Sequence, residues 1–489
     1  MPPSVLSKTN FLYGLQCQKY LWTLLHDPQS VPQPDAAMQF IFDQGRDVGD
    51  FAKKLFPGGI DIPTADFTAS IRITRENLSG NKPLFEAGIL AGNIFCRLDV
   101  LFPSGDGQWD IIEVKSSTSV KDVNIWDVAF QRFCCESAGL KIRSCKLAYI
   151  NNKYVRRGEI DPQQLFIIED ITQRVIDASG GLAERVEEIL AVMHQQQCPE
   201  VGIGPYCTDP YECPLQQVCW EFLPEHNIFD LYWAGKKRFE LYENGILHLK
   251  DIPAGFILNG KQQIQVQCAT SGEPHINREG ISNFLGSLQY PVYYLDFETF
   301  GTSIPLFEGT RPYQQIPFQF SLHVQLDNDE GAVHFSYLAE GAEDPRPKLA
   351  EELKQLLGDS GSIVAYYAPF EKQVLEALAE AYPQYKEWVD SLQNRIVDLL
   401  KPFSNFHYYH PNQRGSSSLK KVLPAMTGIS YEGLAINDGK LAGVAFMAAT
   451  YGTASEDERK QIRQDLEEYC GQDTGGMVEI MRKLVAMAG

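Results

Sequence analysis

The chain has 489 residues, of which 44% are hydrophobic and 22% are charged, and this balance excludes collagen-like, low-complexity and wholly disordered proteins. Its length suggests about three domains, or two large domains with a connector. The 43 basic and 63 acidic residues give a net charge of −20, which argues against a protein that coats nucleic acid over its whole surface but not against an enzyme with one local groove. No apolar run is long enough to span a membrane and the N-terminus lacks a signal-peptide pattern, so we expect a cytoplasmic protein with no membrane partner.

The first part of the chain mixes helical and strand patterns. Helices are predicted from apolar residues that recur with a period of about 3.6, and strands from short apolar runs bounded by turn residues. In chain order the predicted elements are helices over 11–26 and 42–56, strands over 84–92, 93–102 and 109–117, a helix over 120–140 and a strand over 144–155. This order predicts a mixed α/β domain over residues 1–225.

Residues 226–288 are less regular, with scattered Gly, Pro and Asn, and we interpret them as a connector or small accessory module. A second α/β domain is predicted over 289–489. Its predicted elements are a buried strand over 290–300, a hairpin of strands over 319–326 and 333–338, a helix over 347–359, a strand over 361–368, a helix over 370–382 and a long helix over 456–487. Strands that alternate with helices imply a sheet with crossover connections.

One predicted hairpin in the first domain carries a candidate site. Asp99 lies on one strand, and Glu113 and Lys115 lie two residues apart on the next, so both point to the same face. Carboxylates of this kind can bind Mg²⁺, and the lysine can stabilise charge that develops on a phosphate. The alternative is a surface hairpin with an exposed ion pair, but the flanking apolar residues favour a buried strand.

This pattern resembles the PD-(D/E)XK nuclease superfamily. Gln131, on the following predicted helix, is similar to the glutamine of the Q-x-x-x-Y helix in RecB-like nucleases, although Cys135 stands where those have tyrosine. The resemblance implies a restriction-endonuclease-like fold with Glu86 as a further acidic metal ligand and Lys115 and Gln131 as catalytic residues. Arg46 stands where many relatives have a metal-binding histidine, and arginine does not bind metal ions.

Four cysteines form a second candidate site. Cys207, Cys213 and Cys219 have C-x5-C-x5-C spacing, Cys17 lies far upstream, and Cys198 is a spare. Thiolates can hold Zn²⁺ or a [4Fe–4S] cluster, and chance clustering is the third interpretation. The layout resembles the iron–sulfur staple of RecB-like nucleases, which implies that Cys17, Cys207, Cys213 and Cys219 bind a [4Fe–4S] cluster, with zinc as the alternative.

A third candidate site begins at Asp296 and Glu298, which lie two residues apart on a predicted buried strand and repel each other unless a cation lies between them. This D-x-E pair resembles the first motif of DnaQ-like exonucleases on the RNase H-like fold. The resemblance extends to Glu371, where relatives usually have aspartate, and to Tyr469 and Asp473, one helical turn apart. It implies that the four acidic residues bind Mg²⁺ or Mn²⁺ and that the tyrosine orients the attacking water.

Three other residues near these motifs have open interpretations. Asp398 is either a further acidic ligand or a helix cap. Lys420 and Lys421 could contact the backbone of a bound strand, or simply lie on a solvated helix face.

The chain as a whole resembles an uncharacterised bacterial family that fuses a RecB-like nuclease with an iron–sulfur staple to a DnaQ-like exonuclease domain. The leading hypothesis is therefore a metal-dependent nuclease that hydrolyses DNA, as an exonuclease on single-stranded ends, in DNA repair or phage defence. Two alternatives stay open: an RNA-processing exonuclease, and a nucleic-acid-binding protein in which a site has decayed.

Overall fold

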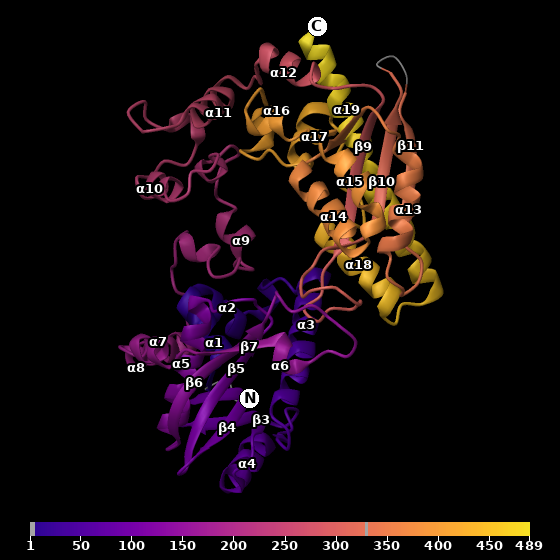
Figure 1. The fold of residues 1–489 in the computed structure, drawn as a ribbon. Helices are drawn as coiled ribbons and strands as arrows, with labels where there is room; N and C mark the ends of the chain where they lie inside the picture. Colours follow the sequence, from indigo (N-terminus) through magenta and orange to yellow (C-terminus); the bar gives the residue numbers. More distant parts are fainter. Residues whose placement is uncertain (1–4, 328–330) are drawn as a thin grey trace. The chain divides into compact units, whose positions relative to one another are not determined.

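The computed structural model describes residues 5–327 and 331–489 (Figure 1). Its contacts divide the chain into two units, which are described separately. The first unit contains the chain up to Phe222 together with Thr302–Tyr313, and the second contains Leu223–Gly301 and Gln314–Gly489. Both units combine helices with a mixed β-sheet, which confirms the α/β class. The predicted turn of the 319–338 hairpin includes residues 328–330, which lie outside the described residues.

The sheet of the first unit has the strand order β2-β3-β4-β5-β6-β7, with β1 parallel to β4. Its strands are β1 (Leu6–Ser7), β2 (Ile60–Asp61), β3 (Leu84–Ala91), β4 (Ile94–Gly105), β5 (Gln108–Lys115), β6 (Lys141–Ile150) and β7 (Phe166–Asp170). Strands β3, β4 and β5 form an antiparallel meander, as predicted for the hairpin. Strand β6 is parallel to β5, which requires a crossover, and α5 (Asp122–Ser137) makes it.

Helices cover both faces of this sheet. They are α1 (Lys8–Gln16), α2 (Gln18–His26), α3 (Ala36–Ala52), α4 (Phe67–Asn77), α6 (Pro162–Leu165), α7 (Thr172–Ala178), α8 (Leu182–His194) and α9 (Gln216–Trp220), besides α5. The prediction of one helix over 11–26 is wrong. The backbone of Cys17 is extended, with φ −159°, and this residue separates α1 from α2.

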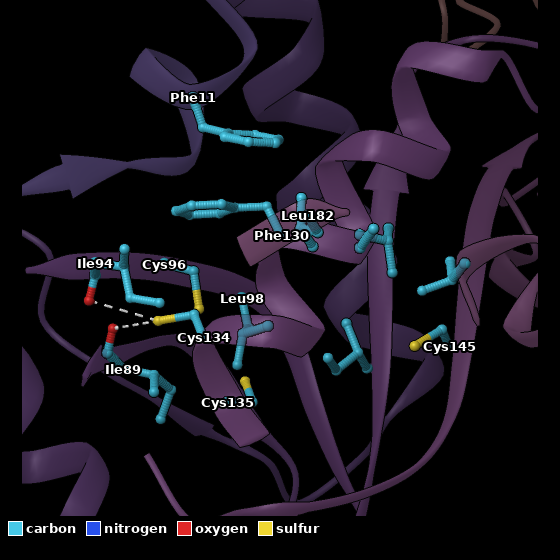
Figure 2. Close-up of a cluster of buried hydrophobic side chains, with 14 of the residues drawn as sticks. Phe11, Ile89, Ile94, Cys96, Leu98, Phe130, Cys134, Cys135, Cys145 and Leu182 are labelled. Carbon is cyan, nitrogen blue, oxygen red and sulfur yellow. Dashed lines mark hydrogen bonds between the residues drawn. The ribbon is translucent and has the colours of Figure 1, made fainter. Parts of the chain in front are cut away.

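The main core of the first unit lies between α5 and the sheet (Figure 2). Phe11 on α1 stacks on Phe130 of α5, with ring centroids 4.6 Å apart. A second apolar cluster on the opposite face joins Val48 of α3 to Ile112 and Val114 of β5. Strand β5 is therefore buried on both faces, and a polar side chain on it must find its partners inside the protein.

The sheet of the second unit has the order β11-β10-β9-β12-β13. Strands β9 to β11 are antiparallel neighbours, whereas β12 and β13 run parallel to β9 and to each other. A separate pair joins β8 to β14. The strands are β8 (His275–Ile276), β9 (Val292–Phe300), β10 (Ile316–Gln325), β11 (Val333–Leu338), β12 (Ser362–Ala365), β13 (Ile396–Asp398) and β14 (Tyr408–Tyr409).

Alternate residues of β9 point to opposite sides of this sheet. Tyr293, Leu295 and Phe297 pack in one apolar cluster with α13, α14 and α15, while α18 and α19 cover the other face of the strand (Figure 1). The helices are α10 (Lys237–Glu243), α11 (Gly260–Ser271), α12 (Arg278–Leu285), α13 (Arg346–Leu356), α14 (Ala368–Ala381), α15 (Lys386–Gln393), α16 (Lys401–Ser404), α17 (Leu419–Thr427), α18 (Gly439–Tyr451) and α19 (Glu456–Ala488). The even-numbered residues Asp296 and Glu298 thus lie on the face of α18 and α19.

Two segments have a different setting from the one their sequence suggests. Residues 226–288 belong to the second unit and contain α10, α11 and α12, with a small apolar cluster around Ile228 and Leu241. Thr302–Tyr313, between β9 and β10, belongs to the first unit because Arg156 Nη1 donates to the carbonyls of Pro305 and Leu306, at 3.0 and 2.6 Å. In the described parts of the chain, no helix is both long and apolar enough to cross a membrane.

Candidate active sites

The hairpin of β4 and β5 opens at Asp99. Backbone pairing between the strands reaches Val100 opposite Ile112 and goes no further toward Asp99. Where the ladder stops, the Val114 N–H donates to Asp99 Oδ2 at 2.7 Å, so a side chain takes the place of a backbone acceptor. Asp99 is thereby fixed beside the end of β5 that carries Glu113 and Lys115.

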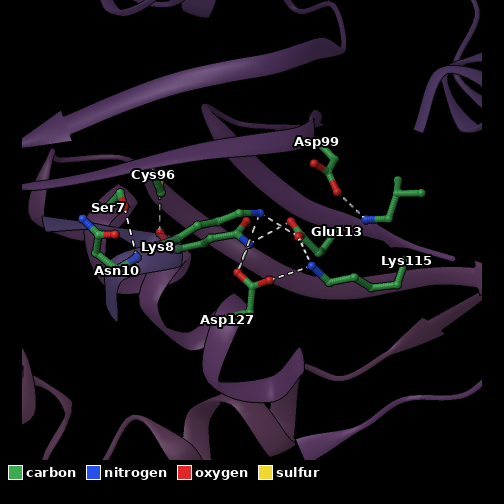
Figure 3. Close-up of polar contacts among 10 residues, drawn as sticks. Ser7, Lys8, Asn10, Cys96, Asp99, Glu113, Lys115 and Asp127 are labelled. Carbon is green, nitrogen blue, oxygen red and sulfur yellow. Dashed lines mark hydrogen bonds and ion pairs between the residues drawn. The ribbon is translucent and has the colours of Figure 1, made fainter. Parts of the chain in front are cut away.

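Glu113 lies at the centre of a buried polar network (Figure 3). Its side chain is only 1% exposed. Glu113 Oε1 accepts from Lys115 Nζ at 2.6 Å and from Lys8 Nζ at 2.7 Å, while Oε2 accepts from Gln131 Nε2 at 2.8 Å. Asp127 completes the network, because its carboxylate accepts from Lys115 at 2.7 Å and from Gln131 at 2.8 Å.

The charged side chains in this network shift one another's pKa values. Burial raises the pKa of Glu113 to about 7, and the nearby Asp127 and Asp99 charges add to this. Burial also opposes ionisation of Asp127, but Lys115 and Lys8 outweigh it and hold the pKa of Asp127 below its ordinary value. Burial likewise lowers the pKa of Lys115, yet Asp127 and Glu113 outweigh it and keep that pKa well above the ordinary value.

Lys8 and Asp127 belong to this site although the sequence analysis missed both. Asp127 had a usable signal, since it precedes Gln131 by four residues on one helix face. Lys8 had none, because it comes from the chain's start. Pairing of Leu6 with Ile94 sets β1 along β4, and the Ser7 side chain then caps α1 by accepting from the Asn10 N–H at 3.1 Å. This corner carries Lys8 to Glu113.

Glu86 lies on β3 at the register position opposite Asp99. The neighbouring residues Phe85 and Ala87 pair with β4, but Glu86 does not, and its φ of 57° is in the left-handed region. Such a conformation is unfavourable for a non-glycine residue and is often found at functional sites. Burial raises the pKa of Glu86. The side chains of Glu86 and Asp99 line one cavity of about 440 Å³, together with Lys8 and Arg97.

Arg46 on α3 lies outside this network. It forms an ion pair with Asp43, one turn earlier on the same exposed helix face, and its side chain is largely exposed. The structure therefore gives Arg46 no part in holding Glu113 or Asp99.

The four predicted cysteine ligands converge. Cys17 at the break between α1 and α2 lines one small cavity with Cys207, Cys213 and Cys219. Gln16 helps to join the two segments, since its Nε2 donates to the carbonyls of Tyr206 and Tyr211, at 2.9 and 2.6 Å. The spare Cys198 is exposed and is not among the residues that line this cavity. The first and last parts of the first unit thus meet at four thiols.

In the second unit, four carboxylates come together from three elements. Asp296 and Glu298 come from β9, Glu371 from the first turn of α14, and Asp473 from the middle of α19. Each carboxylate has its pKa raised by burial, and the charges of the others raise the pKa of Asp296, Glu298 and Glu371 further. Glu371 is 2% exposed, and its Oε2 has no hydrogen-bond partner. Such mutual repulsion is relieved by a bound cation.

Two tyrosines flank Asp473. Tyr469 lies one turn earlier on α19, as the spacing predicted, and its side chain is buried. Tyr431 was not predicted, and its hydroxyl donates to Asp473 Oδ1. Burial raises the pKa of Asp473 to about 6, and the hydrogen bond from Tyr431 opposes that rise. The Lys420 ammonium lies 5.3 Å from the Tyr469 ring centroid, so this lysine is close to the site.

Cys470 also lies in this carboxylate cluster, and like Tyr431 it was not predicted from the sequence. Its thiol is fully buried and donates to Asp296 Oδ2 at 3.7 Å. In the described residues, one group of His, Cys, Asp and Glu has three ligand atoms within 4.8 Å of one another, and it consists of Asp296, Glu298 and Cys470. The signal was present, because Cys470 precedes Asp473 by three residues and shares its helix face.

The remaining candidates are placed as follows. Asp398 ends β13, and its Oδ1 accepts from the backbone N–H groups of Tyr367 and Leu400, at 3.1 and 3.0 Å. Lys420 and Lys421 line a cavity of about 380 Å³ that Tyr431 also lines.

Comparison with known proteins finds a family described as a domain of unknown function, DUF2779, over residues 293–418. Two similar proteins are described as uncharacterised. They are the MG366 homolog of Mycoplasma pneumoniae, 29% identical over 38% of this chain and 31% of its own length, and MG366 of Mycoplasma genitalium, 28% identical over 41% of this chain and 32% of its own length. The chain thus spans about a third of the length of the curated relatives that it matches. A solved structure, described as the crystal structure of SSO0001, covers 46% of this chain and 89% of its own, with 12% identity and a TM-score of 0.24.

Proposed function

We propose that the chain is a metal-dependent nuclease with two hydrolytic sites, a PD-(D/E)XK-type site in the first unit and an RNase H-like, DnaQ-type site in the second. The observation that carries the proposal is the convergence of four carboxylates in one cluster. Glu298, Glu371 and Asp473 are buried, and Asp296 is half-buried. Such a cluster of acidic groups has no stabilising role of its own, because each ionised carboxylate opposes the others. Cation binding accounts for it.

Mg²⁺ or Mn²⁺ bound there would supply an activated water and neutralise the leaving oxygen of a phosphodiester. The protein's own residues would then orient the water and attract the substrate. Tyr469, one turn from Asp473, orients the attacking water. Lys420, near the Tyr469 ring, attracts the phosphates of an approaching strand. In the proposed step the water oxygen would bond to phosphorus as the bond from phosphorus to the sugar oxygen breaks. One proton of the water would pass to solvent, and the departing sugar oxygen would take up a proton from solvent to become a hydroxyl.

In the first unit, Asp99, Glu113 and Glu86 are the oxygen ligands of the proposal. Lys115 contacts Glu113 and Asp127, and it would turn toward the scissile phosphate when a cation replaces it on the carboxylates. Gln131 holds Glu113 and Asp127 in place from α5, and its Oε1 is buried with no hydrogen-bond partner. That free acceptor is available to a bound water.

The cysteine cluster fits a [4Fe–4S] group better than zinc. Zinc sites prefer paired cysteines separated by about two to four residues, whereas Cys207, Cys213 and Cys219 have C-x5-C-x5-C spacing. All four thiols line one cavity, and a cluster bound there would hold Cys17 against the Cys207–Cys219 segment.

Digestion of end-labelled single- and double-stranded DNA with Mg²⁺ or Mn²⁺ tests the proposal. We expect Lys115→Ala and Asp296→Ala each to remove the products of one site, and the double variant to lose at least 100-fold in rate. Lys82→Ala and Asp359→Asn change exposed residues and are the controls. A double variant as active as the wild type would overturn the proposal. RNA of the same sequence in parallel reactions identifies the preferred substrate.

A second candidate, nucleic-acid binding without cleavage at the first site, has one specific observation in its favour. Lys8 and Lys115 both occupy Glu113 Oε1, which neutralises the carboxylate that a metal ion would need. This candidate would be favoured if the protein binds labelled nucleic-acid ends tightly in Mn²⁺, if Lys115→Ala does not change that binding, and if the first-unit site yields no cleavage products.

A further inference from the structure

Cys470 places a sulfur atom in the carboxylate cluster of the second unit. It lies on α19 between Tyr469 and Asp473, with its side chain toward β9. One ligand atom each of Cys470, Asp296 and Glu298 lie within 4.8 Å of one another, which a single ion can bridge. Two carboxylates and one thiol therefore share a position that a cation can occupy.

Glu371 is a further buried carboxylate near this position, and one of its oxygens lacks a partner. Its Oε2 is buried with no hydrogen-bond partner, in a residue only 2% exposed. The charges that act on it most strongly are those of Asp296 and Glu298. A buried carboxylate oxygen with no donor costs free energy unless something binds it. A cation held by Asp296 and Glu298 would relieve the repulsion that acts on Glu371.

The bonding of Cys470 differs from that of other buried cysteines. Cys134 in the first unit donates to two main-chain carbonyl oxygens, at 3.5 and 3.6 Å (Figure 2). Cys268 in the second unit also donates to a main-chain carbonyl, at 3.9 Å. Both are ordinary packing contacts of a small apolar side chain. Cys470 instead donates to the carboxylate of Asp296, which is one of the proposed metal ligands.

We propose that Cys470 is a metal ligand, and that the second-unit site takes a thiophilic divalent transition metal such as Zn²⁺ or Co²⁺ with Cys470 sulfur and the Asp296 and Glu298 oxygens. Thiolate sulfur favours zinc and similar ions, whereas an all-oxygen site suits Mg²⁺. Binding exchanges the thiol proton for the metal: the S–H bond breaks, a sulfur–metal bond forms, and one proton is released to solvent. The inference uses the same carboxylates as the proposed function but concerns which ion they hold.

Titration of the full-length protein with Co²⁺ alone tests the inference, because cobalt–thiolate bonds absorb in the near ultraviolet. We expect the wild type to show this band. We expect Cys470→Ser to lack the component of the band that depends on Co²⁺ binding at Asp296. Zn²⁺ affinity should fall at least tenfold in Cys470→Ser while Mg²⁺ affinity changes less than twofold. Cys268→Ser is the matched control and should keep both the band and the affinities. Wild type and Cys470→Ser share every other cysteine, so a difference between their bands reports Cys470 alone.

Equal bands and equal Zn²⁺ affinities in wild type and Cys470→Ser would overturn the inference. Cys470→Ala provides a second variant, in which no oxygen replaces the sulfur. The ratio of Zn²⁺ affinity to Mg²⁺ affinity can also be compared between wild type and Asp296→Asn, and in that comparison Cys470 itself is unchanged. The outcome is separable from that of the proposed function. If the wild type cleaves DNA with Mg²⁺ but Cys470→Ser keeps the full cobalt band, the proposed nuclease stands and the sulfur ligand is wrong. If Cys470→Ser loses the band but the wild type cleaves nothing, the sulfur ligand stands and the proposed nuclease is wrong.

Discussion

Glu113 shows how one buried carboxylate depends on residues from distant parts of the chain. Its two oxygens accept from Lys8, Lys115 and Gln131, which come from α1, β5 and α5. Removal of one partner from a buried ion pair leaves a charge without compensation, and this costs more free energy than the pair itself contributes. The network is therefore sensitive to each of its members.

Lys8→Met tests this dependence. The Lys8 side chain is 20% exposed, so we expect the free energy of unfolding of the first unit to fall by about 2 kcal/mol, below the range for fully buried pairs. Urea unfolding followed by tryptophan fluorescence measures the change. Lys82→Met, at an exposed position with no ion pair among the described residues, should stay within about 0.5 kcal/mol. Equal stability of the two variants would contradict the assigned role of Lys8.

Asp473 gives the second site a pH dependence. Its pKa is raised to about 6, so protons compete with the cation below that pH, and divalent-metal affinity should rise as the pH increases from 5 to 7. Isothermal titration with Mn²⁺ at several pH values measures this. Tyr431→Phe removes a hydrogen bond that lowers the pKa of Asp473, and it should move the midpoint to higher pH by roughly one unit. A midpoint that stays fixed in the variant would rule out this coupling.

At the level of elements, close packing of α18 on β9 positions the second site. A Cβ atom on Gly443 of α18 would come within 2.8 Å of the Thr299 carbonyl oxygen on β9, which is closer than real contacts allow. The same helix begins at Gly439, where a Cβ would lie 3.4 Å from Glu298 Oε2. The two glycines let the helix approach the strand that carries the carboxylates.

Gly443→Ala should therefore push α18 away from β9 and destabilise the second unit by about 1–3 kcal/mol, with weaker Mn²⁺ binding. Gly475→Ala is the matched control on α19. A Cβ there would make only ordinary contact, 3.7 Å from the nearest His323 atom, so helix propensity should stabilise the protein by about 0.5–1 kcal/mol. Thermal unfolding and metal titration of both variants measure the difference. A stabilising Gly443→Ala would show that the helix does not need this close approach.

At the scale of the whole molecule, the four thiols join parts of the first unit that are far apart in sequence. Cys17 meets Cys207, Cys213 and Cys219 across most of that unit, and a link that closes so long a segment restricts the unfolded chain. Bound metal contributes its binding free energy to folding when the ligands are not preformed in the unfolded state. A cluster bound by these four thiols, as we propose, would therefore stabilise the unit that contains Glu113.

Cys213→Ser should accordingly lose the absorption near 400 nm and the bound iron that we expect for the wild type, and lower the unfolding temperature of the first unit by roughly 10 °C. Cys198→Ser should change neither, because Cys198 is exposed and does not line the cluster cavity. Iron analysis and calorimetry on aerobically purified protein measure both effects. If the wild type is colourless and contains one zinc ion per chain, the four cysteines bind zinc and not an iron–sulfur cluster.

The sequence by itself determined the elements whose pattern is local. The strands around Asp99, Glu113 and Asp296 and the helices that carry Gln131 and Asp473 follow from short-range periodicity, and so do pairs that share a strand or helix face. Only the tertiary structure decided which side chains meet across elements. Lys8 reaches Glu113 because β1 pairs with β4, Tyr431 reaches Asp473 from a loop, and Cys17 breaks a helix that periodicity joins. These contacts depend on packing between residues far apart in sequence, for which periodicity carries no information.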